Sequence, residues 1–272
     1  MPSRQPLLFV SHGAPTTALE KDSAFARSLA RFGAANKPRA IVVMSAHWET
    51  RGGVSIASAP RPPLLYDFGG FAPELYQIKY PCPGSPELAL QVQALLQKAG
   101  TQATLDPRRG LDHGAWTPLV LGWPGADLPV VQISLPEDEP AAIAALGAAL
   151  SPLRDEGVLL LGSGTAVHNL RKVRFGVPDG PPEQWAQDFD TWLAGRVQAL
   201  DLDSLERYRT LAPHAATAQP TPDHFNPLFF VLGAARDGDA ARTVYEGFQY
   251  GTLSMRTFAI ERASSSVIHG NP

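Results

Sequence analysis

The sequence predicts a single α/β domain with a central, mostly parallel or mixed sheet flanked by helices. Short runs rich in leucine and β-branched residues alternate with longer segments whose apolar residues follow a helical period. Four of the short runs are apolar and bounded by turn residues, as buried strands usually are: residues 7–10, 40–44, 130–134 and 158–161. We expect these four runs to form the centre of the sheet.

The clearest helix follows Ser85. Pro86 stands at its first position, apolar residues recur on one face from Leu88 to Ala99, and Gly100 ends the pattern. A second apolar face of the same period runs over residues 185–200, and we interpret it as core packing. Weaker patterns predict helices over residues 22–32, 139–150 and 227–235, and strands over residues 245–260 with a bend at Gly251.

A proline- and glycine-rich segment over residues 59–83 predicts a long loop. A loop of this length in a compact domain is usually functional or mobile. It carries several residues that could form the wall of a pocket: Tyr66, Asp67, Phe68, Phe71, Tyr76 and Tyr80.

Composition limits the kind of protein. We expect the 272 residues to form one domain over residues 1–263, followed by a short tail over residues 264–272. The formal net charge of −3 without any run of like charge argues against nucleic acid or an anionic membrane as partner. No stretch is long enough to span a membrane or to form a signal-peptide core. Cys82 is the only cysteine, which excludes an internal disulfide and a thiolate metal cluster and favours a cytoplasmic location.

Histidines follow the predicted strands. His12 lies two residues beyond the first strand, His47 lies three beyond the second, and His168 follows the fourth across a glycine-containing turn. Open α/β sheets bind ligands at the carboxyl ends of their strands, and His224 could join this edge from just before a helix. Imidazole suits Zn, Cu, Fe and Ni, so the pattern predicts a catalytic metal site.

Other interpretations apply to individual residues. A single histidine more often has a structural role, and we expect that role for His214, which has no strand before it. The Gly162-Ser163-Gly164 turn does not complete a nucleophile-elbow pattern. Acidic residues near the histidines are expected to orient imidazoles: Glu49, Asp112 and Asp223.

A series of short motifs resembles the class III extradiol ring-cleavage dioxygenases, and within them the DOPA 4,5-dioxygenase-like branch. The motifs are SHGAP at 11–15, SAHWE at 45–49, YDF at 66–68, ELY at 74–76, YPCPG at 80–84, LDHGAW at 111–116, GSG at 162–164 with HNL at 168–170, and PTPDHF at 220–225. They occur in order over nearly the whole chain. Each motif is short, but together they are specific.

The resemblance implies roles for particular residues. His12, His47 and His224 would bind the metal, and His168 would be the active-site base and could also approach the ion. His113 would lie beside the substrate or dioxygen and stabilise charge that develops on oxygen. Fe(II) is the implied metal for activity, and three neutral ligands also make Zn a credible occupant.

The resemblance also implies a small catecholic substrate that is opened by O2. Aromatic side chains are candidates to stack on or enclose the ring: Trp48, Tyr66, Phe68 and Trp116. The chain departs from the family pattern at Gln219, where a histidine is usual, and at Asp223, where a glutamate is usual. Specificity could therefore differ from that of DOPA-cleaving relatives, with His214 as one substitute for the missing imidazole.

Two other classes of protein remain open at this point. A Zn-dependent hydrolase could use the same histidines to generate a hydroxide nucleophile, with Glu49 or Asp223 as base. A metal-storage protein would need the ligands but not His168 or His113. A homo-oligomer is compatible with each of these functions.

Overall fold

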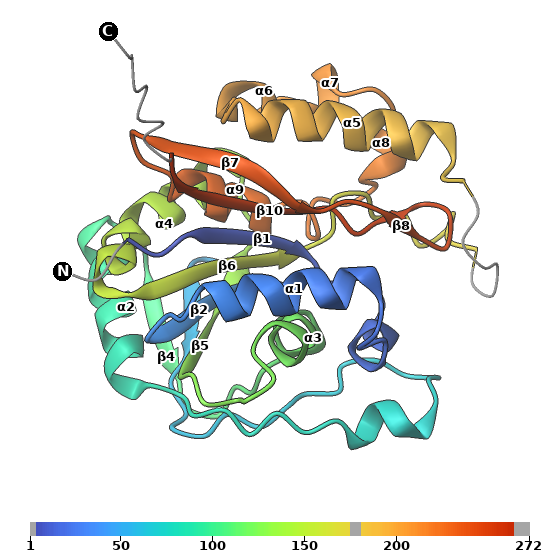
Figure 1. Ribbon diagram of the computed structural model, residues 1–272. Coiled ribbons are helices and arrows are strands. Elements are labelled where there is room, and N and C mark those ends of the chain that lie inside the picture. Colours follow the sequence, from blue (N-terminus) through green and yellow to red (C-terminus); the bar gives the residue numbers. More distant parts are fainter. Residues whose placement is uncertain (1–3, 175–180, 264–272) are drawn as a thin grey trace, which may run out of the picture.

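The fold is an eight-stranded mixed sheet with helices on both faces (Figure 1). The computed structural model describes residues 4–174 and 181–263, so the expected tail at 264–272 lies outside the described residues. The strand order is β4-β3-β5-β2-β6-β1-β10-β7. The strands are β1 (Leu7–Ser11), β2 (Ala40–Thr50), β3 (Val54–Ala57), β4 (Ala103–Asp106), β5 (Val130–Pro136), β6 (Val158–Gly164), β7 (Asp239–Tyr245) and β10 (Thr257–Arg262), and the short β8 (Phe248–Gln249) and β9 (Leu253–Ser254) pair separately.

The four predicted strands are the four parallel strands at the centre. β2 pairs in parallel with β5 and β6, and β6 pairs in parallel with β1. Antiparallel pairing appears outside this centre, where β10 joins β1 and where β3 meets β5. The expectation of a single α/β architecture with a mixed sheet is therefore confirmed.

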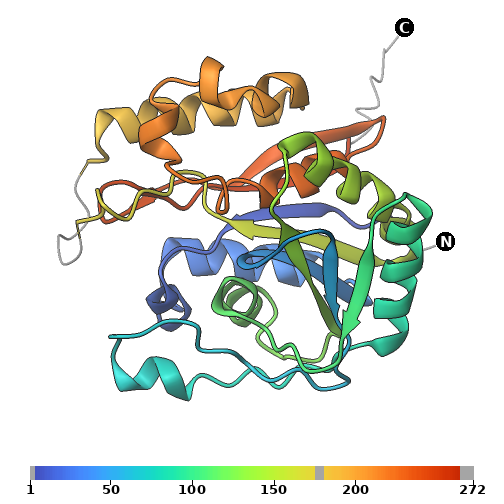
Figure 2. The same ribbon diagram turned by 180° about the vertical axis from the view of Figure 1, so that it is seen from behind.

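Helices cover both faces of the sheet (Figures 1 and 2). The α-helices are α1 (Ala24–Ala35), α2 (Pro86–Lys98), α3 (His113–Gly122), α4 (Pro140–Leu150), α5 (Gln184–Gln198), α6 (Leu202–Glu206), α7 (Tyr208–Leu211), α8 (Ala215–Ala218) and α9 (Pro227–Gly233), and the 3-10 helices are η1 (Pro15–Leu19), η2 (Pro73–Gln77) and η3 (Ser151–Glu156). One buried cluster packs α1 and α3 against one face, and the other packs α2, α4, α5 and α9 against the opposite face. Successive residues of β1 alternate between these clusters, as the pleat of a strand requires.

Local chemistry explains the helices that were predicted. The Ser85 hydroxyl accepts a hydrogen bond from the backbone N–H of Leu88, and Pro86 occupies the first turn of α2. Helix α3 was not predicted, because nearly all of its residues are buried and it therefore lacks a polar face. Gly114 and Pro118 inside it also lower its helix propensity.

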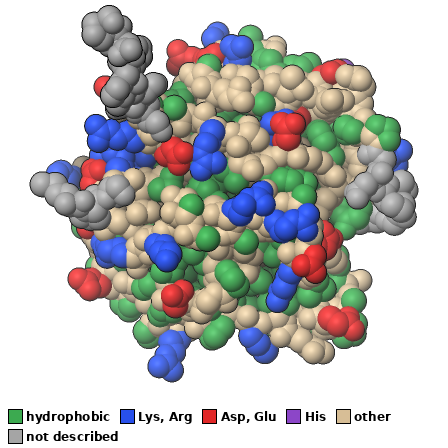
Figure 3. Space-filling view, in the orientation of Figure 1, with side chains coloured by type: hydrophobic (Ala, Val, Ile, Leu, Met, Phe, Trp, Pro, Cys, Tyr) green, Lys and Arg blue, Asp and Glu red, His purple; other side chains and the backbone are tan. Residues whose placement is uncertain are grey.

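The surface carries charges of both signs. Lys and Arg side chains are interspersed with Asp and Glu on the face shown in Figure 3, without a large patch of one sign. Among the described residues, no helix is both long and apolar enough to cross a membrane.

Candidate metal centre and active site

The site lies at the carboxyl edge of the parallel strands. His12 directly follows β1, and its backbone N–H donates to the carbonyl of Gly164 at the end of β6 over 3.0 Å. This bond continues the β1–β6 pairing by one residue. His12 is therefore held by the sheet itself and is almost fully buried.

His47 lies in an irregular part of β2. The sequence predicted a strand ending near Met44, but β2 continues to Thr50. Its pairing with β5 shifts between Met44, opposite Ile133, and Glu49, opposite Leu135. This bulge interrupts the regular ladder where His47 is placed beside His12.

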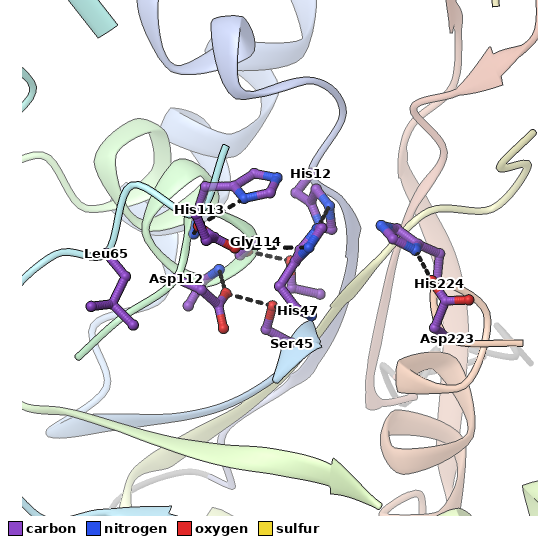
Figure 4. A network of polar contacts seen from close by, with 12 residues as sticks. His12, Ser45, His47, Leu65, Asp112, His113, Gly114, Asp223 and His224 are labelled. Atoms are coloured by element: carbon purple, nitrogen blue, oxygen red, sulfur yellow. Dashed lines mark hydrogen bonds and ion pairs between the residues drawn. The ribbon is translucent and has the colours of Figure 1, made fainter. Parts of the chain in front are cut away.

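His113 is the first residue of α3. The Asp112 side chain caps this helix by accepting from the N–H of Ala115. The same carboxylate accepts from the Ser45 hydroxyl over 2.7 Å and therefore ties α3 to β2 (Figure 4). Helix α3 is thus fixed close to the strand that carries His47.

Gly114 permits the close approach of α3. A Cβ atom at this position would lie 2.4 Å from Ser45 Oγ, 2.8 Å from His47 Cδ2 and 3.2 Å from His12 Cε1. A side chain at Gly114 would therefore displace the imidazoles.

His168 and His224 come from segments that meet beyond β6. The backbone N–H of Thr165 donates to the carbonyl of His224 over 2.8 Å. Gly164 permits this contact, because a Cβ there would lie 2.1 Å from the same carbonyl oxygen. The rings of His168 and His224 stack with centroids 3.5 Å apart and an interplanar angle of 9°.

Hydrogen bonds fix the tautomers of three imidazoles. Ser163 donates its hydroxyl proton to the carbonyl of Gly114, so its oxygen must accept from Nδ1 of His12, 3.0 Å away. The Asp67 carboxylate accepts from Nδ1 of His113 over 3.0 Å. Asp223 accepts from Nδ1 of His224 (Figure 4). In each neutral ring the Nε2 lone pair remains available, as metal-binding histidines require.

The distances between the rings suit a metal ion. Nε2 of His12 lies 3.1 Å from Nε2 of His47. Two nitrogens bound to one Zn or Fe ion at about 2.0–2.1 Å are about 3 Å apart, which matches this distance. The ring of His224 points toward this pair, with centroids 5.4 Å from His12 and 4.9 Å from His47 (Figure 4).

Among the described residues, two groups of side chains could bind a metal ion. The ligand atoms of His12, His47 and His113 lie within 4.8 Å of one another, as do those of His168, Asp223 and His224. A histidine cluster that could bind a metal is therefore present at the predicted edge of the sheet.

Burial favours the neutral form of four imidazoles, those of His12, His47, His168 and His224. Burial, with the nearby rings of His113 and His224, lowers the pKa of His47 to about 3. Burial likewise lowers the pKa values of His168 and His224 to about 4, and it lowers the pKa of His12 well below its usual range. Neutral imidazole is the form that coordinates metals, so protons do not compete for the Nε2 positions near pH 7.

A cavity of about 220 Å³ opens over the histidines. Its wall consists of His12, Gly13, Ala14, Pro15, His47, Phe68, Phe71, His113, His168, Leu170, Val173, His224 and Leu253. All five predicted site histidines therefore reach one cavity. Phe68 and Phe71 reach it from the long loop, which has 3-10 helix η2 within it.

The other aromatic candidates lie away from the cavity wall. Trp116 is fully buried and donates from its indole N–H to the carbonyl of Leu65. Tyr66 donates its hydroxyl to the carbonyl of Ile78, and Trp48 packs beneath the guanidinium of Arg109. Tyr66 and Trp116 both contact Phe68, with ring centroids 6.2 Å and 6.1 Å away.

The acidic residues divide into different roles. Asp223 orients His224, whereas Asp112 caps α3 and bonds Ser45 rather than an imidazole. Asp67 orients His113 and lies 3.9 Å from Nδ1 of His47. From the sequence, Asp67 was expected only in the pocket wall. Its place in the YDF motif was the available signal for its role as the partner of His113.

Gln219 and His214 lie outside the cavity wall. The buried amide of Gln219 donates to the carbonyls of Thr165 and Ala166 and so supports the segment leading to His168. His214 is half-exposed and lies 3.4 Å from Asp188. His214 therefore does not occupy the place of an imidazole at Gln219.

The fold and the histidine-lined cavity define an α/β enzyme with a candidate metal centre, and comparison with known proteins gives its family. Residues 3–257 match the sequence model described as the catalytic LigB subunit of aromatic ring-opening dioxygenase. The chain belongs to this family of extradiol ring-cleavage dioxygenases and is therefore an oxidoreductase.

Relatives match over nearly the full chain. The 4,5-DOPA dioxygenase extradiol of Escherichia coli K12 is 41% identical, and the match covers 95% of this chain and 95% of that protein. The 4,5-DOPA dioxygenase extradiol of Beta vulgaris is 40% identical, and the match covers 92% of this chain and 94% of that protein. The crystal structure of an uncharacterised protein from Escherichia coli K12 superposes with a TM-score of 0.80 at 34% identity. That match covers 94% of this chain and 99% of the other.

Proposed function

We propose that this enzyme opens the ring of a catechol with O2 and uses Fe(II) for activity. The observation that carries the proposal is the convergence of imidazoles with free Nε2 atoms on a mostly apolar cavity, in a chain of the ring-opening dioxygenase family. The substrate named for the two curated relatives, DOPA, is itself a catechol.

His12, His47 and His224 are the proposed metal ligands. Three observations support this set: Nε2 of His12 and of His224 is unprotonated, Nε2 of His12 lies 3.1 Å from Nε2 of His47, and the ring of His224 points toward this pair. Three neutral nitrogen ligands suit Fe(II) and also accept Zn. When bound, Fe(II) supplies the Lewis acidity and the redox chemistry that ring opening by O2 requires.

His168 is the proposed base. Its ring lines the cavity and is neutral near pH 7, so it can accept the proton that a catechol hydroxyl loses on binding. Stacking on His224 holds the ring plane beside the proposed ligand set.

His113 and Asp67 form a proposed second proton-handling pair. Because Nδ1–H of His113 is held by Asp67, the ring presents a lone pair at Nε2 to the cavity. It first accepts there the proton of the second catechol hydroxyl, and the adjacent carboxylate stabilises the resulting imidazolium. The protonated ring can then donate to oxygen atoms that gain negative charge.

Phe68 is the proposed ring contact, because it lines the cavity beside His113. In this proposal Tyr66 and Trp116 pack against Phe68 and hold it in place. Trp48 lies farther from the substrate and helps to enclose the site. We also propose a cytoplasmic location, which the free and buried thiol of Cys82 supports.

The test is anaerobic reconstitution with Fe(II), followed by O2 uptake with a panel of catechols and absorbance of the ring-opened product. We expect stoichiometric uptake, with His224→Ala inactive and lacking bound metal. His214→Ala is the matched control, since His214 lies outside the cavity, and it should keep full activity and metal content. No uptake with any catechol would contradict the function.

Metal analysis of two variants separates the ligand sets. Under the proposal His113→Ala keeps its metal and loses turnover, whereas His224→Ala loses both. The reverse result would assign the third ligand to His113, as the alternative group of close ligand atoms allows. The comparisons give no support to a hydrolase, and a Zn form that hydrolyses esters would be needed to restore that alternative.

A further inference from the structure

Besides its imidazoles, the described part of the cavity wall contains no side chain that could pair with a charged substituent of the substrate. Apart from five imidazoles, the described wall residues are glycine or carry apolar side chains. None of the buried side-chain polar atoms without a partner belongs to a described wall residue. Apart from the imidazoles, the described side chains of the wall therefore offer neither a charge nor a hydrogen-bond partner to a carboxylate or an ammonium group.

The nearest carboxylates are already engaged. Asp67 bonds His113 and Asp223 bonds His224, and neither lines the cavity. Their negative charges disfavour a carboxylate on the substrate, and their hydrogen bonds to imidazole leave them poorly placed for an ammonium group.

Leu170 adds a second observation. Its side chain is 60% exposed although it contributes to the cavity wall. A contiguous exposed apolar patch beside a cavity is typical of a ligand-binding surface. Together with Val173, Leu253 and Phe71 it extends the apolar surface outward from the histidines.

We propose that this site selects catechols with an uncharged, apolar substituent over the zwitterionic amino acid DOPA. The catechol oxygens face the imidazoles, and the substituent packs against Phe71, Leu170, Val173 and Leu253. This inference rests on the proposed function for its catechol, and it assigns the chemical class of the rest of the substrate. Burial of each methylene is worth about a fourfold gain in affinity.

The binding test uses Zn-loaded protein and titration calorimetry, so that no turnover is needed. Three ligands share a three-carbon chain on the ring: 4-propylcatechol, 3-(3,4-dihydroxyphenyl)propanoate and DOPA. We expect the propyl compound to bind at least about tenfold more tightly than the other two. Equal or tighter binding of DOPA or the propanoate would overturn the proposal.

Leu170 allows a matched pair of variants. Leu170→Arg should strengthen binding of the propanoate at least about fivefold through a new ion pair. Leu170→Gln has a similar reach without the charge and should only weaken binding of the propyl compound. If both variants leave all three affinities unchanged, Leu170 does not contact the substituent and the proposal fails.

The exposed cations Arg171 and Lys172 directly follow Leu170 in the chain and provide the rival explanation. Neither lines the cavity, so replacing both with glutamine should leave the ratio of affinities unchanged. Loss of propanoate or DOPA binding in that variant would show that a basic rim selects anionic substrates instead.

Oxygen uptake by the Fe(II) enzyme separates the two proposals. Uptake with several catechols but a preference for DOPA refutes only the selectivity. Absence of uptake despite the expected order of binding refutes only the ring-opening function.

Discussion

For His12, His113 and His224, a single hydrogen bond to Nδ1 decides whether Nε2 can bind metal. An imidazole has two nitrogens, and the one that bears the proton cannot coordinate. Ser163, Asp67 and Asp223 each hold a different Nδ1–H, which leaves Nε2 directed at the common cavity. These partners are as much a part of the site as the rings that they orient.

Ser163→Ala should lower metal affinity without unfolding the protein. The variant frees Nδ1 of His12, so the ring can rotate or adopt the other tautomer. Loss of such an orienting partner typically costs about 10- to 100-fold in affinity. Competition with a chelator measures the metal affinity of wild type and variant. An unchanged affinity would show that the β1–β6 pairing alone orients His12.

Gly114→Ala should abolish metal binding. Its Cβ would lie 2.4 Å from Ser45 Oγ and 2.8 Å from His47, both in buried surroundings. Gly195→Ala is the control, since nothing lies within 4 Å of its Cβ position in α5, and it should stabilise the protein by about 0.5–1 kcal/mol. Metal content and thermal unfolding should be measured for both variants. Normal metal binding by Gly114→Ala would contradict the prediction that a side chain at this position displaces the imidazoles.

At the scale of elements, α3 and the bulge of β2 build one half of the site. Neither feature would form the site alone, because a bulge only interrupts the pairing of two strands and a helix start only positions one side chain. Asp112 joins them by capping α3 and accepting from Ser45 of β2. It also accepts from Gln132 on β5 and from Arg109.

Asp112→Ala should therefore lower the free energy of unfolding by more than the loss of an ordinary helix cap does. Removing an N-cap costs about 0.5–2 kcal/mol, and here the buried Ser45 and Gln132 donors would also lose their acceptor. Ser85→Ala removes the cap of α2 without such partners and should cost about 1 kcal/mol. Urea unfolding of the two variants tests the difference, and equal losses would show that the Asp112 network adds nothing to the cap.

The predicted elements were those whose chemistry is local. The four central strands and α2 are specified by runs of apolar residues and by a serine-proline start, so their sequences suffice. Helix α3 is buried all round and has no period to detect. The extension of β2 to Thr50 depends on pairing with β5, which the strand's own residues do not show.

At the scale of the whole molecule, one buried ion pair joins distant parts of the chain. Arg154 in η3 pairs with Asp239 at the start of β7, and both side chains are fully buried. The guanidinium also donates to the carbonyls of Gln5, before β1, and Ala234, after α9. The pair thus anchors the antiparallel side of the sheet to its parallel centre.

Asp239→Asn should destabilise the protein by about 3–5 kcal/mol at neutral pH, because it leaves a buried guanidinium without its counter-charge. Although burial alone would raise it, the hydrogen bond and charge of Arg154 lower the pKa of Asp239 in the folded protein. A lowered folded-state pKa contributes stability above the unfolded value of about 3.9, and this contribution is lost as pH falls through the folded value.

The stability difference between wild type and Asp239→Asn should therefore shrink below about pH 4. Denaturant unfolding of both proteins from pH 7 to pH 3 measures it. A difference that stays constant over this range would show that the Asp239 carboxylate does not titrate with the proposed coupling to Arg154.

Local sequence patterns were enough to predict the central sheet, the edge at which the histidines gather and the resemblance to extradiol dioxygenases. These features follow from local patterns, because hydrophobic period and strand-end position are properties of short segments. The tertiary structure decided which side chains meet. Asp67 reaches His113 from a loop 46 residues away, and Ser163 reaches His12 from a strand 151 residues away. The tertiary structure also places Trp116 in the core and Phe68 at the cavity, since burial depends on packing between elements that no single segment encodes.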